Sequence, residues 1–251
     1  MNTFEILNSE FSSQSFANEP PQTEILDRYR DIACNYARME NAIAVLSDLR
    51  SSTSHIYYGG FSRMLGIGCN RKDSRLPSIW EEEIFNLLHP DDLAGKHLQE
   101  LCFFNFIKHQ PKKKRQDYYL MSKLRMRTGS NDYIPVLHRM FYIPSPTNDS
   151  LWLALCLYSP LPFDMPAQCM IINSVNGQTQ ELQKHNNTRI LSTREKQVLS
   201  LIDKGLSSKN IAEMLSISIH TVSRHRQEIL SKLMVRNSIE ACHIAKDLKL
   251  I

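Results

Sequence analysis

The chain has 251 residues, enough for two domains that each have a core of their own. Hydrophobic residues make up 42% and charged residues 22%, as in water-soluble globular proteins, and no apolar run approaches the length that spans a bilayer. Six cysteines are scattered without a close pair, which argues against a disulfide framework and a zinc site. No export signal precedes the first apolar residues. We therefore expect a cytoplasmic protein without a membrane partner.

Charge is unevenly distributed along the chain. Residues 183–251 contain 12 Lys and Arg against 6 Asp and Glu, a net charge of +6. The whole chain has a net charge of +4, so residues 1–182 carry −2. A domain that binds DNA needs positive charge to attract the phosphates, and the basic C-terminal part of the chain meets this requirement. A domain that binds an acidic protein would show the same charge asymmetry.

The N-terminal part begins with residues 1–22, which we expect to be loose because Ser, Asn and Gln dominate them. A long amphipathic helix is expected over residues 23–50. Apolar side chains recur there at alternating steps of four and three, a heptad pattern held for about three repeats. They are Ile25, Tyr29, Ile32, Tyr36, Met39, Ile43 and Leu46.

This helix has two interpretations that the sequence leaves open. In the first it forms a coiled coil with a second copy, and Ile25, Tyr29, Ile32, Tyr36 and Met39 are contacts of a homodimer. In the second it is an amphipathic helix that lies on its own domain. Tyrosine at two seam positions slightly weakens the coiled-coil interpretation.

Residues 51–182 have a mixed pattern that predicts an α+β domain. One short strand, 54–58, is followed by short helical segments and by a helix opening at Pro90-Asp91-Asp92. Three strands then follow one another, and turn-like breaks separate them. This order predicts an antiparallel sheet with short helices. The three consecutive strands are expected at 117–127, 132–142 and 151–158.

The same region resembles a PAS-type sensor domain. The resemblance rests on Tyr57-Tyr58-Gly59, Met64-Leu65-Gly66, His89-Pro90-Asp91-Asp92 and the long paired strands. It implies a sensory and dimerisation role, with room for a small-molecule ligand of unknown identity. The sequence itself points to no cofactor, because the order Cys69-Asn70-Arg71 is the reverse of a flavin-adduct motif and no pair of histidines has metal-site spacing.

An additional hairpin is predicted over residues 168–182, with its turn at Asn176-Gly177. The polar residues 183–190 are expected to form a linker. Residues 191–251 then form a separate domain of four short helices, because helix-start and helix-stop signals alternate along them. Ser192 with Glu195 is a capping box, and the later signals are Gly205, Ser207, Ser218 and Asn237 with Glu240.

The third of these helices divides into two faces. Val222, Ile229 and Leu233 form a buried stripe, whereas the opposite side carries polar groups that can reach base edges. Two short helices joined by a tight turn, with a polar outer face on the second, predict a helix-turn-helix that reads DNA. The alternative, an ordinary solvated face, does not account for the succession of caps and turn. The polar face consists of His220, Ser223, Arg224, Gln227 and Ser231.

Residues 191–251 also resemble a family. The pattern Leu-Ser-Thr-Arg-Glu from Leu191, then Ile211-Ala212, Ile217-Ser218, Thr221-Val222, His225, Ile229 and Lys232-Leu233, is similar to the LuxR/GerE-type helix-turn-helix of bacterial transcription regulators. The resemblance implies an all-α four-helix domain whose third helix enters the major groove and whose fourth makes a dimer contact. It departs from the family at Ser223, where lysine is common, so the operator sequence is not inherited.

The expected site residues fall into three sets. Base contacts are expected from His220, Ser223, Arg224 and Gln227. Phosphate contacts are expected from Ser208, Lys209, Ser218, Thr221, His225, Arg226 and Lys232. Dimer contacts of this domain are expected from Ile239 and Cys242.

The predicted function is that of a sequence-specific transcription regulator whose partners are double-stranded DNA and a second copy of the chain, with RNA polymerase as a further candidate. Two other functions stay open: an adaptor whose basic helical tail binds an acidic protein, and a cofactor-dependent sensor or enzyme in the first half. We expect no enzyme, because no glycine-rich phosphate loop, nucleophile elbow or carboxylate pair is present.

Overall fold

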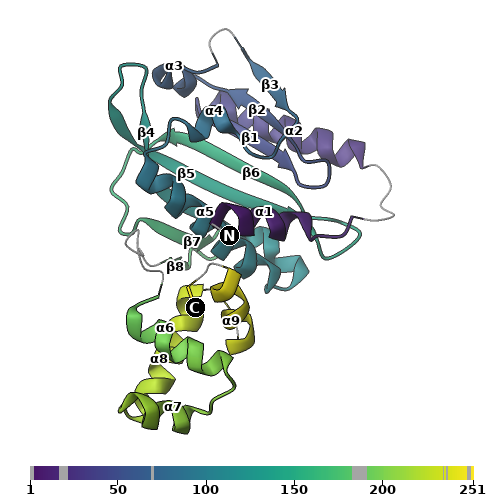
Figure 1. Ribbon diagram of the computed structural model, residues 1–251. Coiled ribbons are helices and arrows are strands. Elements are labelled where there is room, and N and C mark those ends of the chain that lie inside the picture. The colour runs from purple at the N-terminus through teal and green to yellow at the C-terminus, as the bar shows by residue number, and fades with distance from the viewer. Residues whose placement is uncertain are drawn as a thin grey trace. The chain divides into compact units, whose positions relative to one another are not determined.

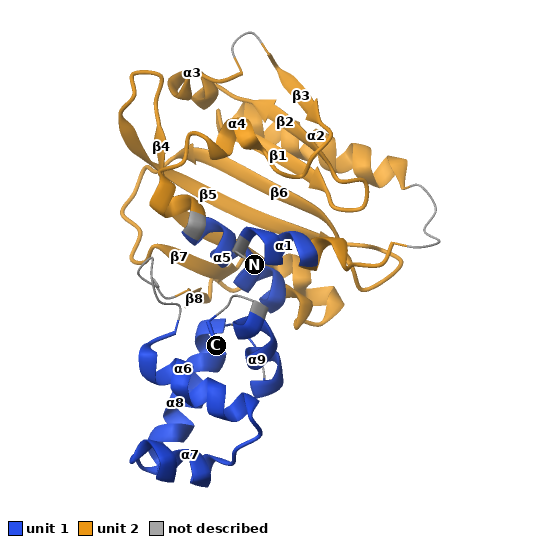
Figure 2. Ribbon diagram, viewed as in Figure 1, with its two compact units in different colours: residues 1–9, 94–106, 183–251 blue, residues 10–93, 107–182 orange. Residues whose placement is uncertain are grey.

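The computed structural model describes residues 3–16, 22–68, 71–182, 191–233, 235, 237–247 and 250–251. The chain divides into two compact units, residues 1–9, 94–106 and 183–251, and residues 10–93 and 107–182 (Figure 2). The first contains the helical domain, and the second contains the sheet (Figure 1). The expected linker, 183–190, lies outside the described residues.

The sheet has eight antiparallel strands in the order β3-β2-β1-β6-β5-β4-β7-β8 (Figure 1). β6 pairs with β1 on one side and β5 on the other, and the long strands β4 and β5 form a hairpin. The expected hairpin at 168–182 is present as β7 and β8. The strands are β1 Ile43–Asp48, β2 Thr53–Tyr58, β3 Asp73–Leu76, β4 Tyr118–Arg127, β5 Tyr133–Pro144, β6 Leu151–Pro160, β7 Cys169–Asn173 and β8 Thr179–Glu181.

Helix α2, Thr23–Met39, lies against one face of this sheet and contacts β1, β2 and β6. Its two buried residues, Ala33 and Ala37, are small, so the helix backbone can approach the sheet closely. They pack with Leu153, Leu155 and Leu157 of β6. The interpretation of the helix as one that lies on its own domain is therefore correct for this face.

The predicted helix over residues 23–50 is wrong in its second half. α2 ends at Met39, and Ile43 and Leu46, expected in the heptad, belong to β1. The break is at Asn41, whose φ of 53° lies in the left-handed region that Asn tolerates better than most residues at a helix end. All six residues of β1 are buried, so the run from Ile43 to Asp48 is a core strand.

The expectation of a loose segment at residues 1–22 is also wrong for part of that range. Helix α1 occupies Thr3–Ser12, and its apolar residues Ile6, Leu7 and Phe11 are buried. The ring of Phe11 stacks on Trp80 with 5.9 Å between centroids. Composition favoured disorder, but three apolar residues at helical spacing supply enough buried surface to order the helix.

The other elements of the first 182 residues are short, apart from one helix. The longer helix is α5, Pro90–Lys108. Near its start, Asp92 accepts hydrogen bonds from the Arg125 backbone N–H and guanidinium, and these bonds hold the first turn of α5 against β4. The short elements are α3 Phe61–Leu65, α4 Glu82–Phe85 and the 3-10 helix η1 Lys112–Asp117. The predicted class, an antiparallel sheet with short helices in a PAS-like architecture, is confirmed.

The helical domain has the predicted order of caps and helices. The capping box of Ser192 and Glu195 is formed in both directions, and Gly205 has the left-handed φ of 80° that ends the first helix. One core is shared by all four helices and contains Val198, Ile211 and Val222. The helices are α6 Thr193–Asp203, α7 Ser208–Leu215, α8 Ile219–Leu233 and α9 Ser238–Asp247. Among the described helices, none is both long and apolar enough to cross a bilayer.

Candidate nucleic-acid interface

The start of α8 is fixed by a tight turn and a serine cap. Ser216 ends α7 in the left-handed region with a φ of 51°. Two residues later the Ser218 hydroxyl accepts a hydrogen bond from the Thr221 backbone N–H at 3.0 Å. The hydroxyls of Ser218 and Thr221 are 2.8 Å apart, so both side chains are already engaged in the cap. This geometry sets the direction in which α8 leaves the turn.

The two predicted faces of α8 are present in the structure. Val222, Ile229 and Leu233 are each at most 1% exposed and join the core of the domain. The five polar residues of the opposite face are all exposed. An α-helix that buries one stripe and presents hydrogen-bonding groups on the other fits the dimensions of a major groove. The exposed residues are His220, Ser223, Arg224, Gln227 and Ser231.

Arg224 is the cation that stands out from this face. Its side chain is 68% exposed, and its Nε lies 3.2 Å from Glu228 Oε1 one turn later. An exposed pair of this kind contributes little to stability. Glu228 can therefore orient the guanidinium without holding it, and the guanidinium stays free to bind a guanine edge or a phosphate.

Arg226 has a different role, because it connects three helices. One guanidinium nitrogen donates to the Ser208 hydroxyl of α7 at 3.0 Å and another to the Ser238 hydroxyl of α9 at 3.1 Å. These bonds hold α8 between its neighbours. The expectation that Arg226 and Ser208 contact phosphates therefore competes with an internal contact that both already make.

Lys232 is also engaged inside the domain. Its ammonium lies 2.6 Å and 2.8 Å from the two carboxylate oxygens of Glu195, which is buried in α6. Burial acts to raise the pKa of Glu195, but hydrogen bonds from Lys232 and Ser192 outweigh it and hold that pKa below its usual range. Lys232 therefore ties α8 to α6.

A group of possible metal ligands lies beside this ion pair. Single ligand atoms of Glu195, His225 and Glu228 approach within 4.8 Å of one another. Both oxygens of Glu195 are already paired with an ammonium, and His225 Nδ1 lies 3.4 Å from Glu228 Oε2. The ammonium of Lys232 supplies the positive charge that the Glu195 carboxylate needs, so the main contact of this cluster is the ion pair of Glu195 and Lys232.

The remaining phosphate candidates differ in exposure. Lys209, in the first turn of α7, is exposed, whereas Thr221 and His225 are half-buried along α8. An exposed ammonium in a first helical turn is able to reach a phosphate without breaking an internal contact. Among the cations expected to contact phosphates, Lys209 thus contributes least to holding the helices of the domain together.

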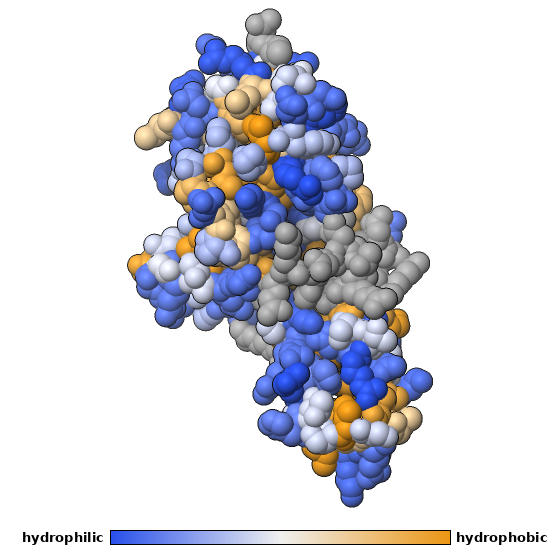
Figure 3. All heavy atoms as spheres, turned by 90° about the vertical axis from the view of Figure 1, so that its left-hand side faces the viewer, coloured by the Kyte–Doolittle hydropathy of each residue, from blue (hydrophilic) through white to orange (hydrophobic). Residues whose placement is uncertain are grey.

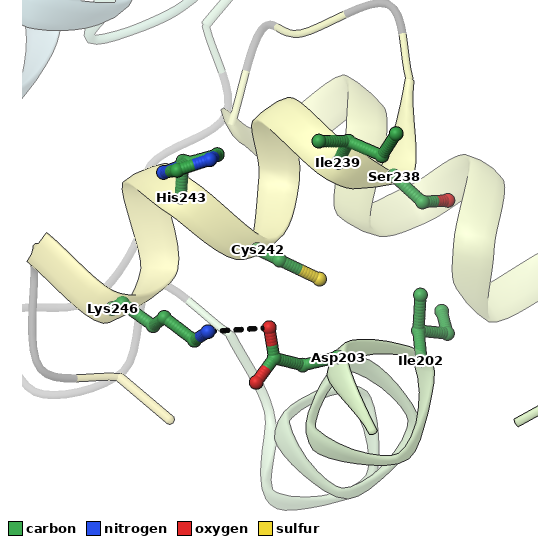
Figure 4. A pocket seen from close by; sticks show the side chains of 7 residues that line it. All are labelled: Ile202, Asp203, Ser238, Ile239, Cys242, His243 and Lys246. Atoms are coloured by element: carbon green, nitrogen blue, oxygen red, sulfur yellow. Dashed lines mark ion pairs between the residues drawn. The ribbon is translucent and has the colours of Figure 1, made fainter. Parts of the chain in front are cut away.

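The two expected dimer residues of α9 line the same pocket but differ in exposure. Ile239 is 75% exposed, but Cys242 is 7% exposed, and its thiol faces the Leu199 carbonyl of α6 at 3.9 Å. Cys242 points towards α6 and lines a pocket beside the ion pair of Lys246 and Asp203 (Figure 4). The pocket has a volume of about 240 Å³. The expectation that Cys242 contacts a second copy does not fit this burial, whereas Ile239 is available.

The family comparison agrees with this geometry. Residues 189–245 match the family model of bacterial regulatory proteins, luxR family. The C-terminal domain belongs to the luxR family. The LuxR-type domain thus comprises α6 to α8 and most of α9, and the exposed face of α8 lies within the matched residues.

Several known proteins resemble part of the chain. Oxygen regulatory protein NreC of Staphylococcus epidermidis is 37% identical over 91 residues, which are 35% of this chain and 42% of that protein. The protein of the same name from Staphylococcus carnosus is 40% identical over 78 residues, 31% of this chain and 36% of that protein. The chain thus spans about two fifths of the length of these curated relatives.

Solved structures resemble the chain more distantly. A complex of phage VqmA with DPO aligns over 90% of both chains with 15% identity and a TM-score of 0.32. A Vibrio cholerae VqmA complex with ligand and DNA covers 87% of this chain and 86% of that chain, with 14% identity and a TM-score of 0.29.

The structure adds two features to the LuxR-type domain that residue types alone did not predict. Arg226 and Lys232 were assigned to phosphates because they are basic and flank the helix, but both contact other helices of the domain. A signal was present for Lys232, since Glu195 stands at the N3 position of a capping box and needs a cation when it is buried. No comparable signal pointed to the Arg226 contacts with two serines.

Proposed function

We propose that the chain is a cytoplasmic, sequence-specific transcription regulator that reads double-stranded DNA with α8. One observation carries the proposal. A LuxR-type domain holds α8 by its core stripe and by Arg226 and Lys232, and it presents His220, Ser223, Arg224 and Gln227 to solvent on the other side. Groups that bind base edges and have no core role are expected in a major-groove reader.

The PAS-like domain is proposed to act as the sensory and dimerisation part of this regulator. Support for a homodimer comes from α2. Its buried alanines face the sheet, whereas Ile32, Tyr36 and Met39 form a neighbouring stripe that is exposed. Met39 is 84% exposed. Two copies would place two α8 helices on a pseudo-palindromic site, which doubles the number of base pairs read. A small-molecule ligand of the sheet domain and a contact with RNA polymerase belong to the same proposal.

The DNA-reading assignment is tested by Arg224→Ala. The full-length protein is used to select duplexes from a random-sequence library, and affinities for a selected duplex and for random DNA are measured by gel shift with competitor DNA. We expect Arg224→Ala to weaken the selected duplex by about 1–3 kcal/mol and random DNA much less, because a bidentate base contact discriminates by that amount. The ratio of the two affinities should therefore fall.

A matched control for this variant is Lys204→Ala. Lys204 is exposed at the end of α6, and its replacement also removes one positive charge but leaves α8 unchanged. We expect this variant to keep the ratio between selected and random DNA. Equal small effects of Arg224→Ala on both DNAs would contradict the assigned face, and failure of the unaltered protein to enrich any duplex would favour an acidic protein partner.

A further inference from the structure

One exposed apolar side chain of α8 has no role in the core. Ile219 is the first residue of the helix and is 51% exposed. The other long apolar residues of α8 are buried in the domain core or packed against it: Val222, Ile229, Leu230 and Leu233. The surface of the helical domain seen in Figure 3 is mostly hydrophilic, with some hydrophobic residues between.

Ile219 lies at the edge of the proposed base-reading face of α8, beside Ser223. It precedes Ser223 by four residues and Gln227 by eight, and these three positions span about 80° of the helix circumference. The cap between Ser218 and Thr221 fixes the first turn and therefore the direction of the Ile219 side chain. The N-terminal residues of a recognition helix are those that approach base edges most closely.

The chemistry of this side chain selects one feature of the groove. An isoleucine neither donates nor accepts a hydrogen bond, so a purine edge or the amino group of cytosine gains nothing from it. The C5 methyl group of thymine is the apolar feature of the major groove. A β-branched side chain has few rotamers, so it loses little conformational entropy when bound DNA immobilises it.

We propose that Ile219 contacts a thymine methyl group and thereby specifies a T·A pair at one position of each half-site. The inference rests on the proposed function, because it assumes that α8 enters the major groove. Burial of one methyl group against an apolar side chain corresponds to roughly fourfold in affinity. Two half-sites read in the same way would multiply to about 15-fold.

The test replaces each thymine of a selected duplex in turn by deoxyuridine, which keeps every hydrogen-bonding atom and removes only the C5 methyl group. In each half-site we expect one such single replacement to weaken binding by the two-domain protein roughly fourfold. Ile219→Ala removes the contact from both copies and should therefore weaken binding to the thymine duplex about 15-fold. The same variant should no longer distinguish thymine from deoxyuridine at that position, whereas Ile219→Val should still do so.

The control is Met214→Ala, which shortens another exposed apolar residue of the same domain, 63% exposed in α7, and should leave the thymine preference intact. The inference is overturned if no deoxyuridine position matters, or if Ile219→Ala keeps the preference. Selection of no duplex by the unaltered protein would overturn the proposed function as well. A thermal melt of Ile219→Ala, expected to match that of the unaltered protein, shows that the loss does not come from unfolding.

Discussion

At the scale of single residues, the basic side chains of α8 divide by what they already contact. Arg224 is exposed and has one weak partner, whereas Lys232 is paired with buried Glu195, and Arg226 bridges two neighbouring helices. Residue type alone makes all three candidates for DNA. Arg224 can leave its partner at a small cost in free energy, whereas removal of Lys232 or Arg226 would disturb the domain.

The Lys232 contact predicts a loss of stability rather than a simple loss of DNA affinity. Lys232→Met removes the ammonium and leaves the Glu195 carboxylate buried without its cation, so we expect the free energy of unfolding of the helical domain to fall by about 2 kcal/mol. Thermal or urea unfolding measures this change. Lys209→Met is the matched control, because Lys209 is exposed, and an equal effect of the two variants would contradict the structural role.

Glu195 also predicts the pH dependence of this domain. The pKa of the folded state is held below the usual value, so the contribution to stability is present above the unfolded pKa and is lost as the pH falls through the folded pKa. We expect unfolding temperatures to drop more steeply below about pH 4 in the unaltered protein than in Glu195→Gln. Parallel curves for the two proteins would show that another carboxylate controls acid unfolding.

At the scale of elements, α2 lies on its own domain, as one of its two sequence interpretations expected, and the other interpretation, a coiled coil with a second copy, stays a prediction. Its small residues Ala33 and Ala37 lie on the sheet, as expected of a helix that covers its own domain. Of the five residues of α2 expected at a dimer contact, Ile25 and Tyr29 are partly buried against the chain's own sheet core, whereas Ile32, Tyr36 and Met39 are exposed. The alanine stripe packs into the core of the sheet domain. The exposed apolar stripe is a surface of α2 that a second copy could cover.

The exposed stripe of α2 predicts where the proposed homodimer can be broken. Met39→Glu introduces a charge at a position that is 84% exposed in the single chain, so we expect the fold to persist and the dimer to dissociate. Mass measured by light scattering across protein concentrations reports the change. Met64→Glu in α3, where Met64 is 55% exposed, controls for the added charge. A dimer that survives Met39→Glu would place the interface elsewhere, for example at Ile239.

At the scale of the whole molecule, the charge is concentrated in the part that is proposed to bind DNA. The C-terminal 69 residues carry +6 and the rest −2, so attraction to phosphates acts on the helical domain. Within that domain, internal ion pairs already engage Lys232 and Lys246. The number of cations that can release counterions from DNA is therefore smaller than the count of basic residues.

Salt dependence measures this number directly. Affinity for random DNA should fall linearly on a double-logarithmic plot against salt, and Lys209→Ala should reduce the slope by about one per bound domain, because Lys209 is exposed in the first turn of α7. The stability of the variant should stay unchanged. An unchanged slope would remove Lys209 from the set of phosphate contacts.

The sequence by itself determined the helical domain and the class of the sheet domain. Ser192 with Glu195, Gly205 and Ser218 act within a few residues of themselves, and the long alternating strands fix their own faces, so local chemistry was sufficient there. Tertiary structure alone decided that the apolar run from Ile43 is a core strand and that α1 is ordered. It also decided that Lys232 binds Glu195. Each of these outcomes depends on residues that are distant in the sequence. A pattern of neighbouring residues does not tell which distant surface will cover a segment or pair with a side chain.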